Sequence, residues 1–149
     1  MTNVCQADVD SLQRLTRDLL AVAMTTVQQS TDVSMQQMRL LFAVHDAGSS
    51  SCGVLAQQLG VAASSVTRLA DRLVASGLLD RTHSADNRSV VLLSLSGAGR
   101  AVIDAVVERR AAVFRNALRR MDSRTRRNLV DGLAELHIAL GDDVRQTVG

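Results

Sequence analysis

Short hydroxyl and guanidinium side chains gather on one face of the segment 61–77, VAASSVTRLADRLVASG. Apolar residues recur there at helical spacing and predict a helix whose buried stripe is Val66, Leu69, Leu73 and Val74. The other face carries the polar residues Ser64, Ser65, Thr67, Arg68 and Arg72. Small hydroxyls at a helix start allow close approach to a groove, and two Arg one turn apart can reach guanine edges or phosphates. This face is therefore predicted to contact DNA.

A shorter helical pattern, residues 51–59, precedes this segment, and Gly60 separates the two. A helix, a Gly-containing turn and a second helix with a polar face are typical of a helix-turn-helix. We place this motif at residues 51–74, with the second helix as the recognition helix.

Two strand-like segments follow the recognition helix, within residues 79–95. Turn-forming residues at 84–87 separate them, so the pattern predicts a hairpin, or wing. The tip carries Asp86, Asn87 and Arg88. Arg88 is expected to enter a narrow minor groove, held by a charge-assisted bond from Asp86. His83, beside the turn, is predicted to contact a phosphate.

The order of these blocks resembles the MarR family of bacterial winged-helix regulators. The residues that carry the resemblance are SVTRLADRLVASGLLDR at 65–81, D-N-R at 86–88, and Leu95, Ser96 and Gly99. The implied fold class is mainly α with a small two- to three-stranded β-wing, a winged helix-turn-helix plus a helical dimerisation region. The family also carries an Asp-x-Arg in the wing.

The chain of 149 residues is most simply one domain, 1–149. Residues 34–96 are expected to form the winged helix-turn-helix module, and Ser34 and Gln37 fit a capping box at the start of its first helix. Ser96 is expected to cap the helix that follows the wing. Residues 7–30 and 97–146 are expected to form the dimerisation helices. Apolar residues at helical spacing run along both terminal segments and need a partner surface, which predicts a homodimer.

Several classes of function lack sequence support. No segment has the pattern of a signal peptide or a membrane span, so we expect a cytoplasmic protein without membrane contact. No His, Cys and carboxylate spacing indicates a metal, no cofactor motif is present, and no local signature pairs a nucleophile with a base. An enzyme is therefore not expected.

The expected function is sequence-specific binding of double-stranded DNA by a homodimer at an inverted-repeat operator. Repression, and release by a small-molecule effector near Phe42 and His45, are implied only by the resemblance. One alternative is a winged-helix dimer used for protein contacts, although the polar recognition face favours DNA. Another is a thiol-based redox-sensing regulator using Cys5 or Cys52.

Residues 100–127 contain nine Arg and only three acidic residues. The basic run Arg109–Arg127 is open to two interpretations. It is a second nucleic-acid surface, or it pairs with acidic residues of the terminal helices across the dimer. The absence of Tyr and Trp, which would stack on single-stranded bases, favours pairing.

Overall fold

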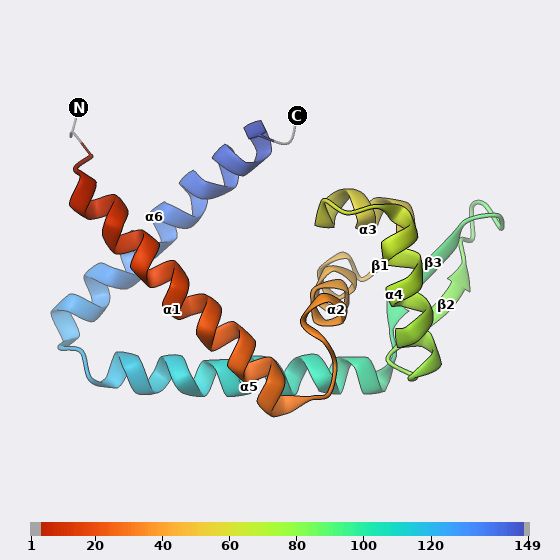
Figure 1. Ribbon diagram of the computed structural model, residues 1–149, viewed down its shortest axis with the longest axis horizontal. Helices are drawn as coiled ribbons and strands as arrows, with labels where there is room; N and C mark the ends of the chain where they lie inside the picture. Colours follow the sequence, from red (N-terminus) through yellow and green to blue (C-terminus); the bar gives the residue numbers. More distant parts are fainter. Residues whose placement is uncertain (1–3, 148–149) are drawn as a thin grey trace. The chain divides into compact units, whose positions relative to one another are not determined.

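The computed structural model describes residues 4–147, and the side chains of residues 4–141. Helices dominate, and a small antiparallel sheet lies between them in the sequence, as predicted (Figure 1). The elements are α1 (Gln6–Ser30), α2 (Met35–Ala47), β1 (Ser49–Ser51), α3 (Cys52–Leu59), α4 (Ala63–Ala75), β2 (Leu79–His83), β3 (Val91–Leu95), α5 (Gly97–Arg119) and α6 (Ser123–Thr147).

The chain forms two compact units, Met1–Arg110 and Ala111–Gly149, and the boundary falls inside α5. The first unit holds the whole winged module together with α1. The second holds the end of α5 and all of α6. The boundary predicted at residue 97, between module and dimerisation helix, differs from this division because the first half of α5 packs into the module core through Ile103 and Val106.

Local side-chain bonds fix where the helices of the module begin and end. The predicted capping box of α2 is confirmed, because Ser34 Oγ accepts from the Gln37 amide and Gln37 Oε1 accepts from the Ser34 amide. Ser51 Oγ accepts from the Val54 amide and caps α3. Gly60 ends α3 in the left-handed region at φ 66°, which glycine adopts without strain. The helix-turn-helix therefore follows the predicted boundaries closely.

The sheet has three strands in the order β1-β3-β2, both pairs antiparallel. The β2–β3 hairpin is the predicted wing, and Figure 1 shows it beside α4. The residue pattern does not predict β1, because Ser49–Ser51 resembles an open loop. Its residues pair with Leu92, Leu93 and Ser94 of β3 and extend the sheet.

The module buries a continuous aliphatic core. Its fully enclosed side chains come from α2, α3, α4, both wing strands and α5. They include Leu40, Leu41, Val44, Leu55, Val66, Leu73, Leu79, Leu93, Ile103 and Val106, each at most 1% exposed. The recognition helix and the wing therefore stand on one shared, close-packed base.

Candidate nucleic-acid interface

The recognition helix α4 turns its apolar stripe into the core and its polar face outward. Val66 and Leu73 are fully buried, and Leu69 and Val74 pack against the core from its edge. Four of the five predicted contact residues are exposed: Ser64, Thr67, Arg68 and Arg72. Ser65 is half-buried instead, and it lines a hollow with Gln36 and Leu59. The exposed face is thus narrower than the sequence suggested.

The start of α4 has free amide donors. Ala62 occupies the N-cap position and has no side chain that could cap the helix. The first amides of a helix have no partner within it, and its N-terminal end carries partial positive charge. An uncapped, exposed start beside Ser64 is suited to a backbone phosphate.

An ion pair connects the recognition helix to the base of the wing. The Arg81 guanidinium of β2 donates to the Asp71 carboxylate of α4. Both side chains are well exposed, so the pair contributes little to folding stability. Its geometric effect is to fix the wing strand against the helix face that carries Arg68 and Arg72.

Ser96 holds the end of the recognition helix to the start of α5. Its Oγ donates to the Gly77 carbonyl at 2.6 Å and accepts from the Gly99 amide at 3.0 Å. Its own amide donates to the Leu78 carbonyl at 3.2 Å. The predicted Ser96 cap of α5 is therefore confirmed. A Cβ at residue 99 would lie 2.1 Å from the Leu78 carbonyl oxygen, so only glycine fits there.

Several polar contacts fix the wing turn, and His83, Asn87 and Ser84 each make at least one through the side chain. His83 Nδ1 lies 2.8 Å from the Arg88 carbonyl oxygen. Asn87 Oδ1 accepts from the Ser89 amide at 3.0 Å, and Ser84 Oγ accepts from the Asp86 amide at 3.3 Å. These bonds occupy the side chains of His83 and Asn87 in shaping the turn, and they leave the Arg88 guanidinium at the tip.

The expected bond between Asp86 and Arg88 is not formed. Within residues 4–141, neither a hydrogen bond nor a salt bridge joins these two side chains. Both Asp86 and Arg88 are exposed, where water solvates each charge and a local pair gains little. His83 contacts the Arg88 carbonyl instead, so the turn is held through the backbone of Arg88 rather than through its side chain.

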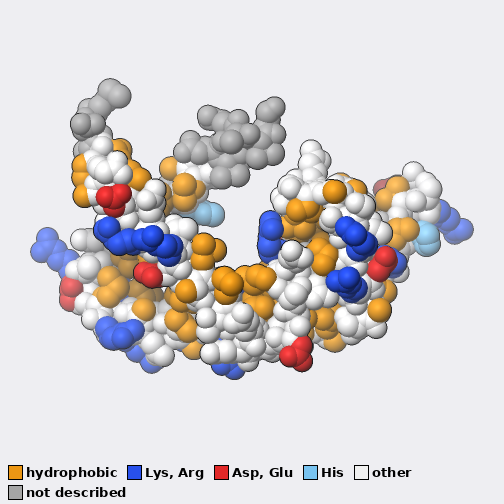
Figure 2. All heavy atoms as spheres, in the orientation of Figure 1, with side chains coloured by type: hydrophobic (Ala, Val, Ile, Leu, Met, Phe, Trp, Pro, Cys, Tyr) orange, Lys and Arg blue, Asp and Glu red, His pale blue; other side chains and the backbone are white. Residues whose placement is uncertain are grey.

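Basic side chains gather over α4 and the wing. Figure 2 shows them in blue on this part of the module. Arg68, Arg72, Arg81 and Arg88 are exposed there, and Asp71 and Asp80 are exposed near them. A basic surface that combines a polar helix face with a hairpin is suited to the grooves and phosphates of duplex DNA.

Comparison with known proteins agrees with this geometry. The MarR family pattern matches residues 33–91. The HTH-type transcriptional regulator Mb0904 of Mycobacterium bovis is 30% identical over 142 residues, covering 91% of this chain and 98% of the relative. The chain belongs to the MarR family. It is accordingly a DNA-binding transcriptional regulator, and Mb0904 is likewise named a transcriptional regulator.

Solved structures show the same winged-helix fold along nearly the whole chain. The crystal structure of Rv1404 from Mycobacterium tuberculosis has a TM-score of 0.83 at 30% identity, covering 93% of this chain and 97% of that one. FabT of Streptococcus pneumoniae, crystallised in complex with DNA, has a TM-score of 0.75 at 22% identity, covering 92% and 97%. The second similarity shows the fold alone.

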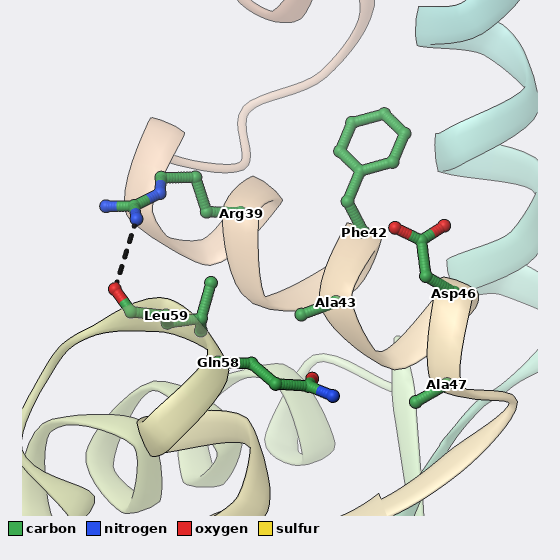
Figure 3. A pocket seen from close by; sticks show the side chains of 7 residues that line it. All are labelled: Arg39, Phe42, Ala43, Asp46, Ala47, Gln58 and Leu59. Carbon is green, nitrogen blue, oxygen red and sulfur yellow. Dashed lines mark hydrogen bonds between the residues drawn. The ribbon is translucent and has the colours of Figure 1, made fainter. Parts of the chain in front are cut away.

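The region predicted to hold an effector forms a pocket between α2 and α3, of about 490 Å³ (Figure 3). Phe42 lines this pocket, whereas His45 is exposed and does not line it. Arg39 and Asp46 place opposite charges on the wall that α2 contributes, and Arg39 donates to the Leu59 carbonyl at 3.4 Å. The pocket wall thus combines these two charges with the Phe42 ring and the aliphatic side chains of Ala43, Ala47 and Leu59.

Beside this pocket, the Arg110 guanidinium lies over the Phe42 ring at 5.6 Å from its centroid. Its Nε is buried and has no hydrogen-bond partner among the described residues. A buried donor without a partner is costly. The stacking on Phe42 offsets part of that cost.

Arg109, the first residue of the basic run, is bound within its own unit. Its Nε donates to Ser30 Oγ at 3.1 Å, and its Nη1 donates to Gln29 Oε1 at 3.4 Å. These bonds join the end of α1 to α5. Arg109 therefore bonds to uncharged side chains of α1, which neither interpretation of the basic run predicts.

The two cysteines lie far apart in the sequence, Cys5 exposed before α1 and Cys52 half-buried at the start of α3. Both are free thiols.

Among the described residues no three His, Cys, Asp or Glu side chains are grouped as metal ligands. In the same part of the chain, every helix is too short or too polar to cross a bilayer.

Proposed function

We propose that this chain is a homodimeric repressor that reads an inverted-repeat operator in double-stranded DNA. The observation that carries the proposal is the exposed polar face of α4, fixed to an adjacent wing through Asp71 and Arg81. Ser64 and Thr67 permit close entry to the major groove, and Arg68 and Arg72 reach base edges and phosphates. Arg88 lies at the hairpin tip, where it can enter the flanking minor groove.

The dimer is proposed from apolar side chains that the single chain leaves in water. On α1 they are Val9, Leu12, Leu15, Leu19, Leu20 and Met24, between 37% and 56% exposed. On α6 they include Val130, Leu133, Ile138 and Leu140, between 43% and 66% exposed. Patches of this kind on a regulator mark an interface. A two-fold dimer presents two recognition helices to successive major grooves, so half-sites should be inverted and about 10 bp apart.

Repression and its release follow from where such a dimer would sit. Bound across a promoter, it would exclude the polymerase. The pocket lined by Phe42, Arg39 and Asp46 is the proposed effector site. A ligand that favours one spacing of the recognition helices would shift the population toward or away from the DNA-competent form.

The direct test is selection of random DNA fragments by the purified protein, followed by sequencing. We expect an inverted repeat, and Arg68→Ala should weaken binding to it by about 1–3 kcal/mol and relax base preference at one position per half-site. Arg17→Ala, which removes an exposed Arg of α1, is the control for lost charge. Failure to enrich any sequence would contradict the proposal and favour a winged module used for protein contacts.

A further inference from the structure

A hollow of about 640 Å³ opens at the wing tip, lined by His83, Ser84, Ala85 and Arg88. Its polar groups are an imidazole, a hydroxyl and a guanidinium. All are candidates to donate hydrogen bonds to one acceptor. This hollow is separate from the polar face of α4, and the reading of base edges makes no use of it.

The bond at His83 determines which ring nitrogen carries hydrogen. A carbonyl oxygen only accepts, so Nδ1, at 2.8 Å from the Arg88 carbonyl, must donate. In the neutral ring the other nitrogen, Nε2, then has no hydrogen and can only accept. A phosphate oxygen also only accepts. Neutral His83 therefore shapes the wing but cannot bind a phosphate through its remaining nitrogen.

Protonation removes this restriction without disturbing the turn. The imidazolium keeps Nδ1–H on the Arg88 carbonyl and gains Nε2–H together with a positive charge. Ser84 contributes a second donor, because its Oγ accepts from the Asp86 amide and its hydroxyl hydrogen is left for another acceptor. Arg88, whose guanidinium is proposed to enter the minor groove, adds positive charge beside these two donors.

We propose that the hollow at the wing tip binds a DNA backbone phosphate through His83 and Ser84, beside Arg88, and that the site is complete only when His83 is protonated. The inference rests on the proposed DNA-binding function and adds a pH-dependent anchor to it. The ligand class is a phosphodiester of the duplex backbone, which carries no base identity.

The charges around His83 set the direction of the response. Arg88 shares the hollow, Asp86 is in the turn, and Arg81 precedes His83 by two residues on the same strand. Arg81 is paired with Asp71 of α4, and β3, the strand opposite, carries no titratable side chain. A bound phosphate favours protonation of His83, so DNA and the proton should bind cooperatively.

The test is operator affinity of the full-length protein, measured by fluorescence anisotropy at about pH 6 and about pH 8, on either side of the usual protonation range of imidazole. We expect binding to be roughly tenfold tighter at the lower pH, as for a bond to a charged group. The slope of log affinity against log salt should also be steeper there by about 0.9, the value for one added phosphate contact.

His83→Asn is the informative variant, because its amide keeps a donor near the Nδ1 position but cannot take up a proton. It should retain affinity at the higher pH and lose most of the gain at the lower pH. His137→Asn, on α6, is the matched control and should respond as the parent does. Ser84→Ala should weaken binding mainly at the lower pH.

Nitrogen NMR of His83 gives an independent measurement. We expect the neutral ring to carry its hydrogen on Nδ1, and the opposite tautomer would overturn the proposal. Sequence-specific binding with the same affinity at both pH values would also overturn it, while leaving the proposed function intact. Absence of sequence-specific binding at either pH would overturn both.

Discussion

The winged module and the terminal helices solve the burial of apolar side chains in opposite ways. Inside the module, Leu41, Leu55 and Leu73 are completely enclosed by neighbouring elements of the same chain. Along α1, Leu12 and Leu15 keep 44% and 38% of their surface in water, although their spacing is as regular. The module is thus complete within one chain, whereas the terminal helices lack a partner surface. Helical periodicity predicts that a face will be buried, but it does not say whether the same chain buries it.

The difference between the module and the terminal helices is tested most directly by a substitution in the module core. Leu41→Ala should lower the free energy of unfolding by about 2–5 kcal/mol, because it removes buried methyl groups and leaves a cavity. The loss should be independent of protein concentration, since no second chain is involved. Chemical denaturation at two concentrations measures it. A loss that grew on dilution would place Leu41 in an interface and contradict the division.

The opposite result is expected on α1. Leu15→Glu should weaken dimerisation by at least about tenfold, because it inserts a charge into an apolar contact. The loss of stability in Leu15→Glu should grow on dilution, because unfolding is linked to dissociation of the dimer. Gln13→Glu adds the same charge on another side of the helix and is the control. Sedimentation equilibrium distinguishes the two, and an unchanged dimer in Leu15→Glu would locate the interface elsewhere.

The join between recognition helix and α5 offers a sharper contrast between neighbouring positions. Gly99→Ala should cost about 1–3 kcal/mol of stability, because the added Cβ would collide with the Leu78 carbonyl. Gly97→Ala, two residues earlier, meets no atom within 4 Å and should be close to neutral or better. Thermal unfolding of both variants measures the difference. Equal effects would mean that the backbone around Gly99 shifts to accept the added Cβ without loss of stability.

Local chemistry made much of this structure predictable from the sequence. A helix cap depends on residues only three positions away in the sequence. The local pattern therefore predicts the caps at Ser34 and Ser96, and both are confirmed. Strand β1 was not predicted, because three consecutive Ser have little tendency to form a strand and pair only once β3 is beside them.

The candidate site likewise depends on contacts between distant segments, which local patterns do not predict. The polar face of α4 followed from helical periodicity, whereas the half-burial of Ser65 depends on how α2 and α3 pack against it. The ion pair between Asp71 and Arg81 joins residues ten positions apart, and no local pattern signals it. The expected partner of Arg88 was wrong for a related reason. The opposite charges of Asp86 and Arg88 suggested a side-chain pair, but the folded hairpin brings His83 to the Arg88 carbonyl.

The smallest expected effect concerns the turn between α5 and α6, within the second unit. Asp122 Oδ1 accepts from the amides of Arg124 and Thr125 at 3.0 and 2.9 Å and caps α6. Hydrogen bonds from the side chain of Thr125, and then from its backbone, lower the pKa of Asp122 below its usual value. A carboxyl with a lowered pKa stabilises the fold above its unfolded value of about 3.9, and this contribution is lost as the pH falls through the lower, folded value.

Asp122→Asn should therefore reduce the acid sensitivity of unfolding while keeping the cap, because Asn caps a helix nearly as well as Asp. The effect should be small, since the carboxylate is fully exposed. Thermal unfolding between about pH 6 and pH 3 measures it, with Asp104→Asn, an exposed position in the middle of α5, as the control. Because α6 belongs to the proposed interface, a shift seen only in dilute protein would mean that the cap acts through assembly. A shift that is the same at all concentrations would assign it to the helix alone.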